Sequence, residues 1–254
     1  MITIKTEKDL VLMAEGGQIL KEILQALAQA VQPGVTTENL DKLSRELVFS
    51  YGQKHPEAHI KPSFLGYNSY PAYLCVSVND EVVHGIPSDR VIHEGDLVGL
   101  DFGIIYHGWH TDSAVTVGVG EISKENQKLI SVTREALALG IKEAKIGKTT
   151  GDIGYVIQKH IEKHGFGVVK ELVGHGIGRK LHEPPHVPNY GFKGKGEVLK
   201  EGMTIAIEPM VTLGDPALVL SRDNWTYKTK DKSWSAHFEH TLAITKDGPR
   251  VLTG

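Results

Sequence analysis

Apolar side chains recur at helical spacing in four stretches of the chain, which predicts four amphipathic helices. The predicted helices span residues 7–31, 37–51, 125–145 and 150–164. Pro33-Gly34 is expected to end the first helix, Gly52 the second and Gly165 the fourth. The helices therefore come in two pairs, one pair in each half of the sequence.

The stretch from Leu97 to Val119 alternates in polarity and predicts two strands joined by a tight turn at Tyr106–Gly108. Asp101 on the first strand is expected to lie opposite Asp112 on the second, or nearly so, with both side chains on one face. Neighbouring carboxylates repel each other unless a positive charge lies between them. A solvated polar face is the alternative, but small apolar residues flank both acids, so the hairpin favours a cation site.

Two further predicted strands carry acids in hydrophobic surroundings. Residues 203–211 contain Glu208, and residues 235–245 contain Glu239. A lone buried carboxylate is energetically costly. We therefore expect these two acids to need positive charge as well.

Matching motifs in the two halves of the chain indicate an internal repeat. The matches are Glu94-Gly95 with Glu201-Gly202, Asp101 with Glu208, His110-Thr111-Asp112 with His237-Phe238-Glu239, and Gly34 with Gly147. Each half reads as two helices followed by a pair of acid-bearing strands. No linker separates the halves, so we expect one domain over residues 1–254, with halves at roughly 8–120 and 121–254 facing a shared site.

The converging acids determine the expected chemistry. Four carboxylates need more positive charge than one lysine supplies, and two divalent cations would provide it. His175, bracketed by Gly174 and Gly176, adds an imidazole to the set, and the glycines are expected to let the backbone approach a ligand. Such a donor set suits cobalt, manganese, iron or zinc better than a thiolate-based structural zinc site. Paired metals of this kind recur in hydrolases.

Composition narrows the classes of protein that fit. The net charge of −3 argues against direct nucleic-acid binding and against a basic membrane-binding surface. The single cysteine, Cys75, excludes an internal disulfide framework and fits a reducing compartment. The N-terminus has no signal-peptide core, and no run approaches the ~20 apolar residues that span a bilayer. We therefore expect a cytoplasmic protein.

Seven segments together match, in order, the motifs of a known family. They are Val83–Pro87, Asp101, His110–Asp112, Gly174–Gly178, His182–Pro184, Glu208–Met210 and Phe238–Thr241. With these motifs the chain resembles type I methionine aminopeptidase, a peptidase of the pita-bread fold, over nearly its whole length. The resemblance implies an α+β fold in which two pseudo-symmetric helix-helix-strand halves place a curved antiparallel sheet around a central dinuclear metal site.

The same resemblance implies the metal ligands. Asp101 would bind one metal ion, His175 and Glu208 would bind the other, and Asp112 and Glu239 would bridge both. The implied reaction is hydrolysis of the first peptide bond through a metal-bridging hydroxide.

The resemblance also implies three catalytic residues. Glu208 would carry a proton to the leaving amine. His182 would stabilise the oxyanion, and His84 would contact the substrate near the scissile amide.

A pocket for the methionine side chain is implied as well, because sulfur packs favourably against aromatic rings. The pocket residues would be Tyr67, Tyr70, Cys75 and Trp225, together with His84 and His182. The alternative is that these aromatic side chains simply fill core space. The chain departs from many relatives at Leu181, where an aromatic residue is common, and at Phe64, near a second cysteine of some relatives; both changes bear on the shape of the pocket.

The expected function is removal of the initiator methionine from nascent polypeptides whose second residue is small. The partner would be the nascent N-terminus at the ribosome, and the protein is expected to be a monomer that binds neither nucleic acid directly nor membranes. Two alternatives stay open. One is a proline-directed aminopeptidase of the same fold, although such enzymes usually carry an additional N-terminal domain. The other is a non-catalytic pita-bread protein that only binds partners.

Overall fold

A computed structural model describes residues 2–254 and contains the four predicted helices. They are α1 (Glu7–Ala30), α2 (Thr37–Lys54), α3 (Lys124–Glu143) and α4 (Thr150–Lys163), and two short 3₁₀ segments lie at Pro56–Ala58 and Tyr67–Ser69. The prediction that Gly52 ends the second helix is wrong. Gly52 lies in the last turn of α2, which continues to Lys54. His55 is the C-cap, because Pro56 disfavours helical geometry in the residue before it.

Side-chain caps explain where the helices begin. Thr6, Thr36 and Thr149 accept hydrogen bonds from backbone amides three residues later, and Asp9, Asn39 and Asp152 return the contact to the capping backbone amide. This reciprocal pattern satisfies amides that have no partner inside a helix. Helix α3 begins with the simpler cap of Ser123 on the amide of Asn126.

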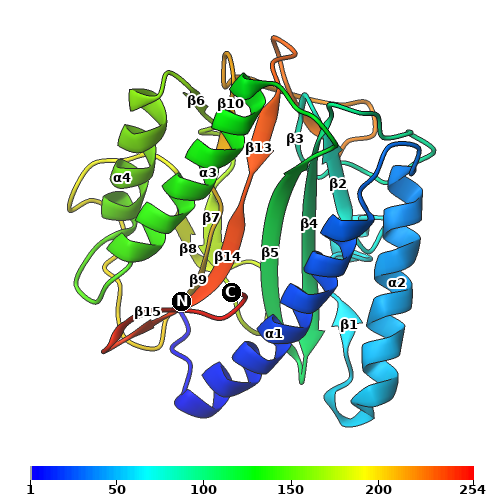
Figure 1. Ribbon diagram of the computed structural model, residues 1–254. Coiled ribbons are helices and arrows are strands. Elements are labelled where there is room, and N and C mark those ends of the chain that lie inside the picture. The colour runs from blue at the N-terminus through cyan, green and yellow to red at the C-terminus, as the bar shows by residue number, and fades with distance from the viewer. Residues whose placement is uncertain (1) are drawn as a thin grey trace.

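One large sheet contains strands from both halves of the chain (Figure 1). Its main path runs β1-β4-β5-β14-β9-β7-β8, with β2 paired to β4 and β15 paired to β14. These strands are β1 (Lys61–Pro62), β2 (Cys75–Val78), β4 (Leu97–Tyr106), β5 (Trp109–Gly118), β7 (Gly174–Gly176), β8 (Glu183–Val187), β9 (Thr204–Ile207), β14 (Glu239–Thr245) and β15 (Gly248–Val251). The two halves join where β5 pairs with β14.

Two small sheets flank the large one. The first contains β6 (Gly167–Val168), β10 (Met210–Thr212) and β13 (Ser235–His237); the second contains β3 (Glu81–Val83), β11 (Leu218–Leu220) and β12 (Tyr227–Thr229). The predicted single strands 203–211 and 235–245 are therefore each broken in two. Glu208-Pro209 separates β9 from β10, where proline has no amide hydrogen to donate to a ladder, and Phe238 separates β13 from β14.

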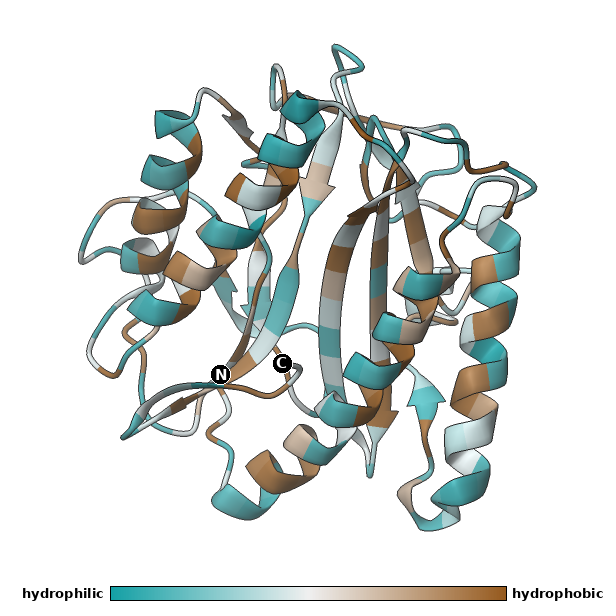
Figure 2. Cartoon of the chain, viewed as in Figure 1, coloured by the Kyte–Doolittle hydropathy of each residue, from teal (hydrophilic) through white to brown (hydrophobic). Residues whose placement is uncertain are grey.

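The helices cover one face of the large sheet, and Figure 1 shows α1 and α3 lying across it. In Figure 2 the helices carry hydrophobic residues in patches between hydrophilic ones, as expected for amphipathic helices packed on a sheet. The buried core forms two large clusters that follow the two halves. One joins α1 and α2 to β2 and β4, and the other joins α3 and α4 to β9 and β14. The opposite face of the sheet is left for the polar side chains.

No helix within residues 2–254 is long and apolar enough to cross a membrane.

Candidate metal centre

The β4–β5 hairpin places both of its acids on the face away from the helices. His107 and Gly108 form a two-residue turn with positive φ, 49° and 76°, so Tyr106 pairs with Trp109. This register pairs Asp101 with Ala114, and Gly103 with Asp112. Asp101 and Asp112 are thus diagonal neighbours two positions out of register rather than directly opposed, and they share one face as predicted.

Ala114 lies at the centre of the site. It pairs with Asp101 on one side and with Glu239 on the other, so the three residues form a row across β4, β5 and β14. Because alanine has only a methyl group, it places no polar atom between the two carboxylates. Glu208 directly follows β9, which pairs with β14, so it comes beside Glu239 at the break before Pro209.

His175 supplies nitrogen from β7. Its Nδ1 lies 2.9 Å from the carbonyl oxygen of Gly176, and its Nε2 lies 3.5 Å from Oε1 of Glu208. A proton on Nδ1 would be donated to that carbonyl, which leaves the Nε2 lone pair free for a metal. The flanking glycines were expected to approach a ligand, but they approach neighbouring strands. A Cβ on Gly176 would lie 2.2 Å from the carbonyl oxygen of Pro184, and one on Gly174 would lie 2.4 Å from that of Ala206.

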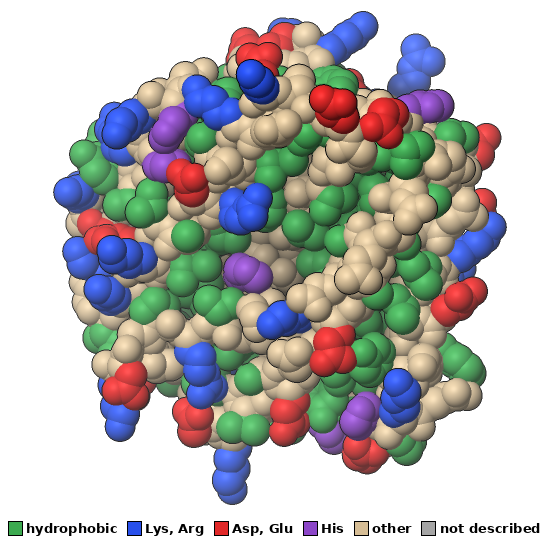
Figure 3. All heavy atoms as spheres, viewed as in Figure 1, with side chains coloured by type: hydrophobic (Ala, Val, Ile, Leu, Met, Phe, Trp, Pro, Cys, Tyr) green, Lys and Arg blue, Asp and Glu red, His purple; other side chains and the backbone are tan. Residues whose placement is uncertain are grey.

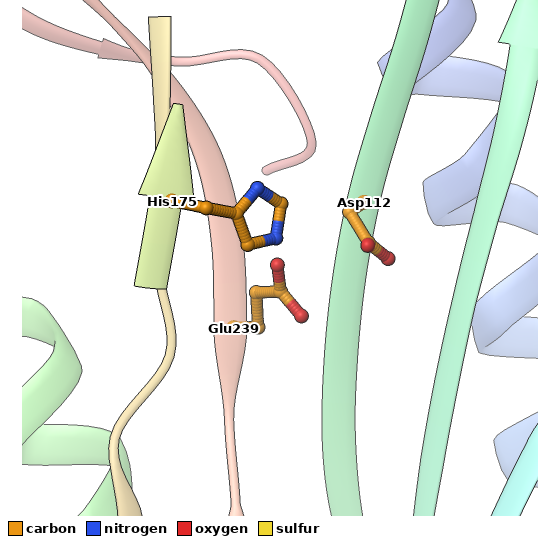
Figure 4. Close-up of side chains that lie close together, drawn as sticks. All are labelled: Asp112, His175 and Glu239. Carbon is orange, nitrogen blue, oxygen red and sulfur yellow. The ribbon is translucent and has the colours of Figure 1, made fainter. Parts of the chain in front are cut away.

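Three of the expected ligands form a compact group. Figure 4 shows Asp112, His175 and Glu239 extending from three different strands, and one ligand atom from each lies within 4.8 Å of the other two. Asp112 is further held by its backbone, because its amide donates to Oγ1 of Thr241 at 2.9 Å and its carbonyl accepts from the same hydroxyl at 2.8 Å.

The electrostatics of the site call for a cation. Burial, reinforced by the negative charge of Asp112, raises the pKa of Asp101, Glu208 and Glu239 well above the usual range. Burial also raises the pKa of Asp112 to about 7. Oδ1 of Asp101 and Oε1 of Glu239 are buried and have no hydrogen-bond partner within residues 2–254. Buried, crowded and unpaired oxygens of this kind fit divalent metal ions, which bind carboxylates in place of protons.

His237 joins the site although it was not among the predicted site residues. Its Nε2 is buried without a hydrogen-bond partner in the described part of the chain and lies 4.0 Å from Oε2 of both Glu208 and Glu239. Burial lowers its pKa to about 3, so the imidazole is neutral. The internal repeat carried the signal, because His237 stands two residues before Glu239 as His110 stands two before Asp112.

A cavity of about 190 Å³ opens directly onto the acids. Its wall contains every predicted catalytic, substrate-binding and metal-binding residue, together with Phe64, Asn68 and Leu181. The two departures from the family pattern therefore do shape this cavity. Asn68 gave no recognisable signal in the sequence, because it reaches the wall only through the backbone turn around Tyr67–Ser69.

The aromatic wall of the cavity is rigidly held. Tyr70 Oη donates to the carbonyl oxygens of Leu74 at 3.1 Å and Gly85 at 3.0 Å, and the ring of Trp225 packs edge-on against Tyr70 with centroids 5.0 Å apart. Tyr70 and Cys75 are also part of a buried hydrophobic cluster. These side chains therefore fill core space and line the cavity at once.

Two histidines border the cavity beside the acids. Tyr67 Oη lies 2.6 Å from Nδ1 of His182, whose ring packs against that of His175 with centroids 4.1 Å apart. His84 has a positive φ of 59°, and burial lowers its pKa to about 4. Burial likewise lowers the pKa of His182. Neutral imidazoles can donate or accept a hydrogen bond, as the chemistry of a polar substrate requires.

Comparison with known proteins agrees with this geometry. The sequence model that describes metallopeptidase family M24 matches residues 11–246 of this chain. The chain belongs to metallopeptidase family M24. A methionine aminopeptidase of Clostridium acetobutylicum is 45% identical over 254 residues, covering 100% of this chain and 99% of the relative.

Solved structures of M24 peptidases share the fold. The crystal structure of methionine aminopeptidase from Thermotoga maritima matches with a TM-score of 0.94 at 44% identity, covering 100% of this chain and 99% of that one. Prolidase from Pyrococcus horikoshii matches with a TM-score of 0.77 at 25% identity, and the match covers 99% of this chain but 63% of the prolidase. The predicted pita-bread fold is confirmed, and so is the assignment to the metal-dependent peptidases.

Proposed function

We propose that this M24 peptidase removes the initiator methionine from nascent polypeptides whose second residue is small. The observation that carries the proposal is that one cavity is lined by both the expected metal ligands and the expected methionine-binding residues. Four carboxylates and an imidazole line the same cavity as aromatic rings and a thiol. Methionine aminopeptidases that match along the full chain support the same activity.

The donor set fits two divalent ions. Asp101 would hold one ion, His175 and Glu208 the other, and Asp112 and Glu239 both, with cobalt, manganese, iron and zinc all suited to these donors. Such ions, when bound, lower the pKa of water and polarise the carbonyl of the bond to be cleaved. The strand pairing supports this arrangement, because Asp101 and Glu239 both pair with Ala114 and so come from adjacent positions across three strands.

Three side chains would contribute the proton transfer, the oxyanion stabilisation and the substrate contact. Glu208 would carry the proton to the leaving amine, since it lies within the donor set and its buried carboxyl binds a proton readily. His182 would donate a hydrogen bond to the oxyanion from Nε2 while its Nδ1 is held by Tyr67. His84, on the cavity wall beside Trp225, would contact the substrate near the scissile amide.

The methionine side chain would fill the aromatic part of the cavity. Tyr70 and Trp225 pack edge to face against each other, and both line the cavity together with Cys75. A thioether is favoured there because sulfur is polarizable and packs well at the edge of aromatic rings.

The two halves, residues 8–120 and 121–254, would act as one catalytic domain. The pairing of β5 with β14 supports this, because it assembles the donor set from both halves. We further propose that the protein works as a monomer in the cytoplasm, on N-termini that emerge from the ribosome. On the face seen in Figure 3, basic and acidic side chains are interspersed, a pattern that does not favour direct nucleic-acid binding.

A turnover assay tests the proposal. Metal-free protein is reloaded with manganese, iron(II), cobalt or zinc and offered Met-Ala-Ser, Met-Lys-Ser and Ala-Pro-Ser, with Asp112→Asn as the inactive control. Methionine release from Met-Ala-Ser alone, and only with metal, would support the proposal and rank the metals. Cleavage of Ala-Pro-Ser would assign the protein to the proline-directed branch. Tight metal binding without any cleavage would favour a non-catalytic binding protein.

A further inference from the structure

The N-terminal arm, residues 2–6, contributes Lys5 to a buried ion pair with Glu183. Glu183 directly follows His182, which lines the cavity. Lys5 Nζ lies 2.7 Å from Oε2 of Glu183, and the two side chains are only 3% and 7% exposed. Thr3 completes the cluster, because its hydroxyl donates to the same carboxylate oxygen at 2.6 Å and accepts from Lys5 Nζ at 2.5 Å. Buried charges are costly unless they are well paired, so this geometry is tightly specified.

The arm is fixed to the protein independently of these side chains. The backbone amide of Lys5 donates to the carbonyl oxygen of Gly202 at 2.7 Å. Gly178 gives the pair room: a Cβ there would lie 2.6 Å from Cε of Lys5 and 2.7 Å from Oε1 of Glu183. The second carboxylate oxygen of Glu183 accepts from the amide of Lys180 at 3.1 Å. The ion pair thus holds residues 178–183 against the arm.

The far side of this turn is held by the β4–β5 hairpin. Arg179 donates to the carbonyl oxygen of His107 at 2.9 Å, and its guanidinium lies 3.9 Å from the centre of the Trp109 ring. The amide of His110 donates to the carbonyl oxygen of Gly178 at 2.8 Å. Residues 178–183 are therefore clamped between the arm and the hairpin.

His182 is the residue of the 178–183 turn that lines the cavity. Its ring has one side-chain hydrogen-bond partner within the described residues, Tyr67 Oη. The ring also packs against those of His175 and Tyr67, and the backbone of the turn sets where it starts from. Glu183 follows immediately and pairs across the sheet with Gly176, next to His175. A shift of the turn by a fraction of an ångström would move the imidazole relative to the reacting carbonyl.

We propose that Lys5 is a positioning residue, which fixes the turn at residues 178–183 through Glu183 and thereby aims His182 at the oxyanion. The inference rests on the proposed function, since it needs His182 to act in catalysis. A misplaced catalytic group loses rate rather than ground-state binding. Loss of the ion pair should therefore lower kcat and leave KM and metal content nearly unchanged.

A double-mutant cycle distinguishes this role from a general structural one. Lys5→Met is made in the native protein and in His182→Ala, with Lys8→Met, an exposed lysine on the first turn of α1, as the matched control. We expect Lys5→Met to lower kcat for Met-Ala-Ser about tenfold in the native background and less than twofold in His182→Ala, because Lys5 acts through the missing imidazole. Thr3→Val, a milder isosteric change, should show the same pattern with a smaller loss if Lys5→Met does not fold.

The outcomes are separable. An equal loss in both backgrounds, or a loss of metal content in step with kcat, would overturn the positioning role in favour of general destabilisation. No loss in Lys5→Met or Thr3→Val would overturn it as well. A native protein that releases no methionine with any metal would instead overturn the proposed function on which the inference rests.

Discussion

The two halves of the molecule deliver the same kind of side chain by different means. The first half presents Asp101 and Asp112 from the middle of an uninterrupted hairpin of ten-residue strands. The second half presents Glu208 and Glu239 where its strands are broken, at Pro209 and at Phe238. The longer side chain suits a ligand that reaches from a strand end. The difference teaches that a repeated fold need not supply equivalent ligands.

The matching histidines of the repeat differ even more. His110 lies two residues before Asp112, near the hairpin turn, and its Nδ1 lies 2.9 Å from the hydroxyl oxygen of Ser63. His237 lies two residues before Glu239 and keeps an unpartnered, buried Nε2 at 4.0 Å from two carboxylates. The second half thus brings two imidazoles, His175 and His237, to its acids. It is the nitrogen-rich side of the metal centre.

Removing one acid from each half would test this comparison most strongly. Glu239→Gln should lose both metal ions and lower kcat/KM by more than ~100-fold, since even residues behind the ligands of metal sites cost 10- to 100-fold. Asp101→Asn should lose one ion of the two. Metal per chain, measured by mass spectrometry, and turnover of Met-Ala-Ser would show the difference. Metal-free Glu239→Gln should also unfold at a higher temperature at pH 7 than metal-free native protein, because the variant avoids the cost of protonating a buried carboxylate whose pKa is raised.

Equal loss of metal in the two variants would contradict the assignment of Glu239 to both ions and of Asp101 to one, and full occupancy in Glu239→Gln would remove its bridging role. Asp96→Asn is the matched control, because Asp96 caps local loops at Asn79 and His93 rather than facing the cavity.

A smaller effect is expected at the paired histidines. His237→Leu should weaken metal binding about 10- to 100-fold, the range for groups that orient metal ligands, because Glu208 and Glu239 lose their neighbouring imidazole. His110→Leu should change it less than twofold. His237→Gln, which keeps an N–H donor of similar reach, should recover most of the loss. Calorimetric titration with manganese would measure all three, and equal losses at His110 and His237 would contradict the assigned asymmetry.

Sequence reasoning succeeded where the determinants are local. Helical spacing and the hairpin turn each depend on a few neighbouring residues, and the predicted shared face of Asp101 and Asp112 is confirmed. The sequence did not predict which residues pair directly with Asp101 and Asp112, because the strand register depends on the turn geometry of His107-Gly108.

The remaining differences come from long-range packing. Pro209 is a local signal for the first break, but the break at Phe238 depends on β13 leaving the large sheet to pair with β10, which no local pattern encodes. The glycines around His175 serve the close approach of β8 and β9, which is visible only once those strands are placed. His237 stands two residues before Glu239 in the sequence, but its distance to Glu208 depends on how the strands of the second half are placed.

The smallest expected effect concerns the starts of helices α2 and α4, where the two halves differ by one negative charge. The residue that bonds back to the capping threonine is neutral Asn39 in α2 and Asp152 in α4. Partial burial raises the pKa of Asp152, but hydrogen bonds from the amides of Thr149 and Gly194 and from the hydroxyl of Thr149 outweigh it, and the net pKa is lowered. A folded-state pKa below the unfolded value stabilises the protein above about pH 4, and this stabilisation is lost as pH falls through the folded value.

Asp152→Asn should therefore lower the free energy of unfolding by about 0.5–1 kcal/mol at pH 7, and the deficit should be smaller at about pH 3, below the usual carboxyl pKa. The reciprocal change, Asn39→Asp, should add a few tenths of a kcal/mol at pH 7 and give α2 the same acid sensitivity, because a carboxylate favours the positive end of the helix dipole. Urea unfolding of both variants at the two pH values measures this. A deficit in Asp152→Asn that stays constant with pH would show that geometry, and not charge, distinguishes the caps of the two halves.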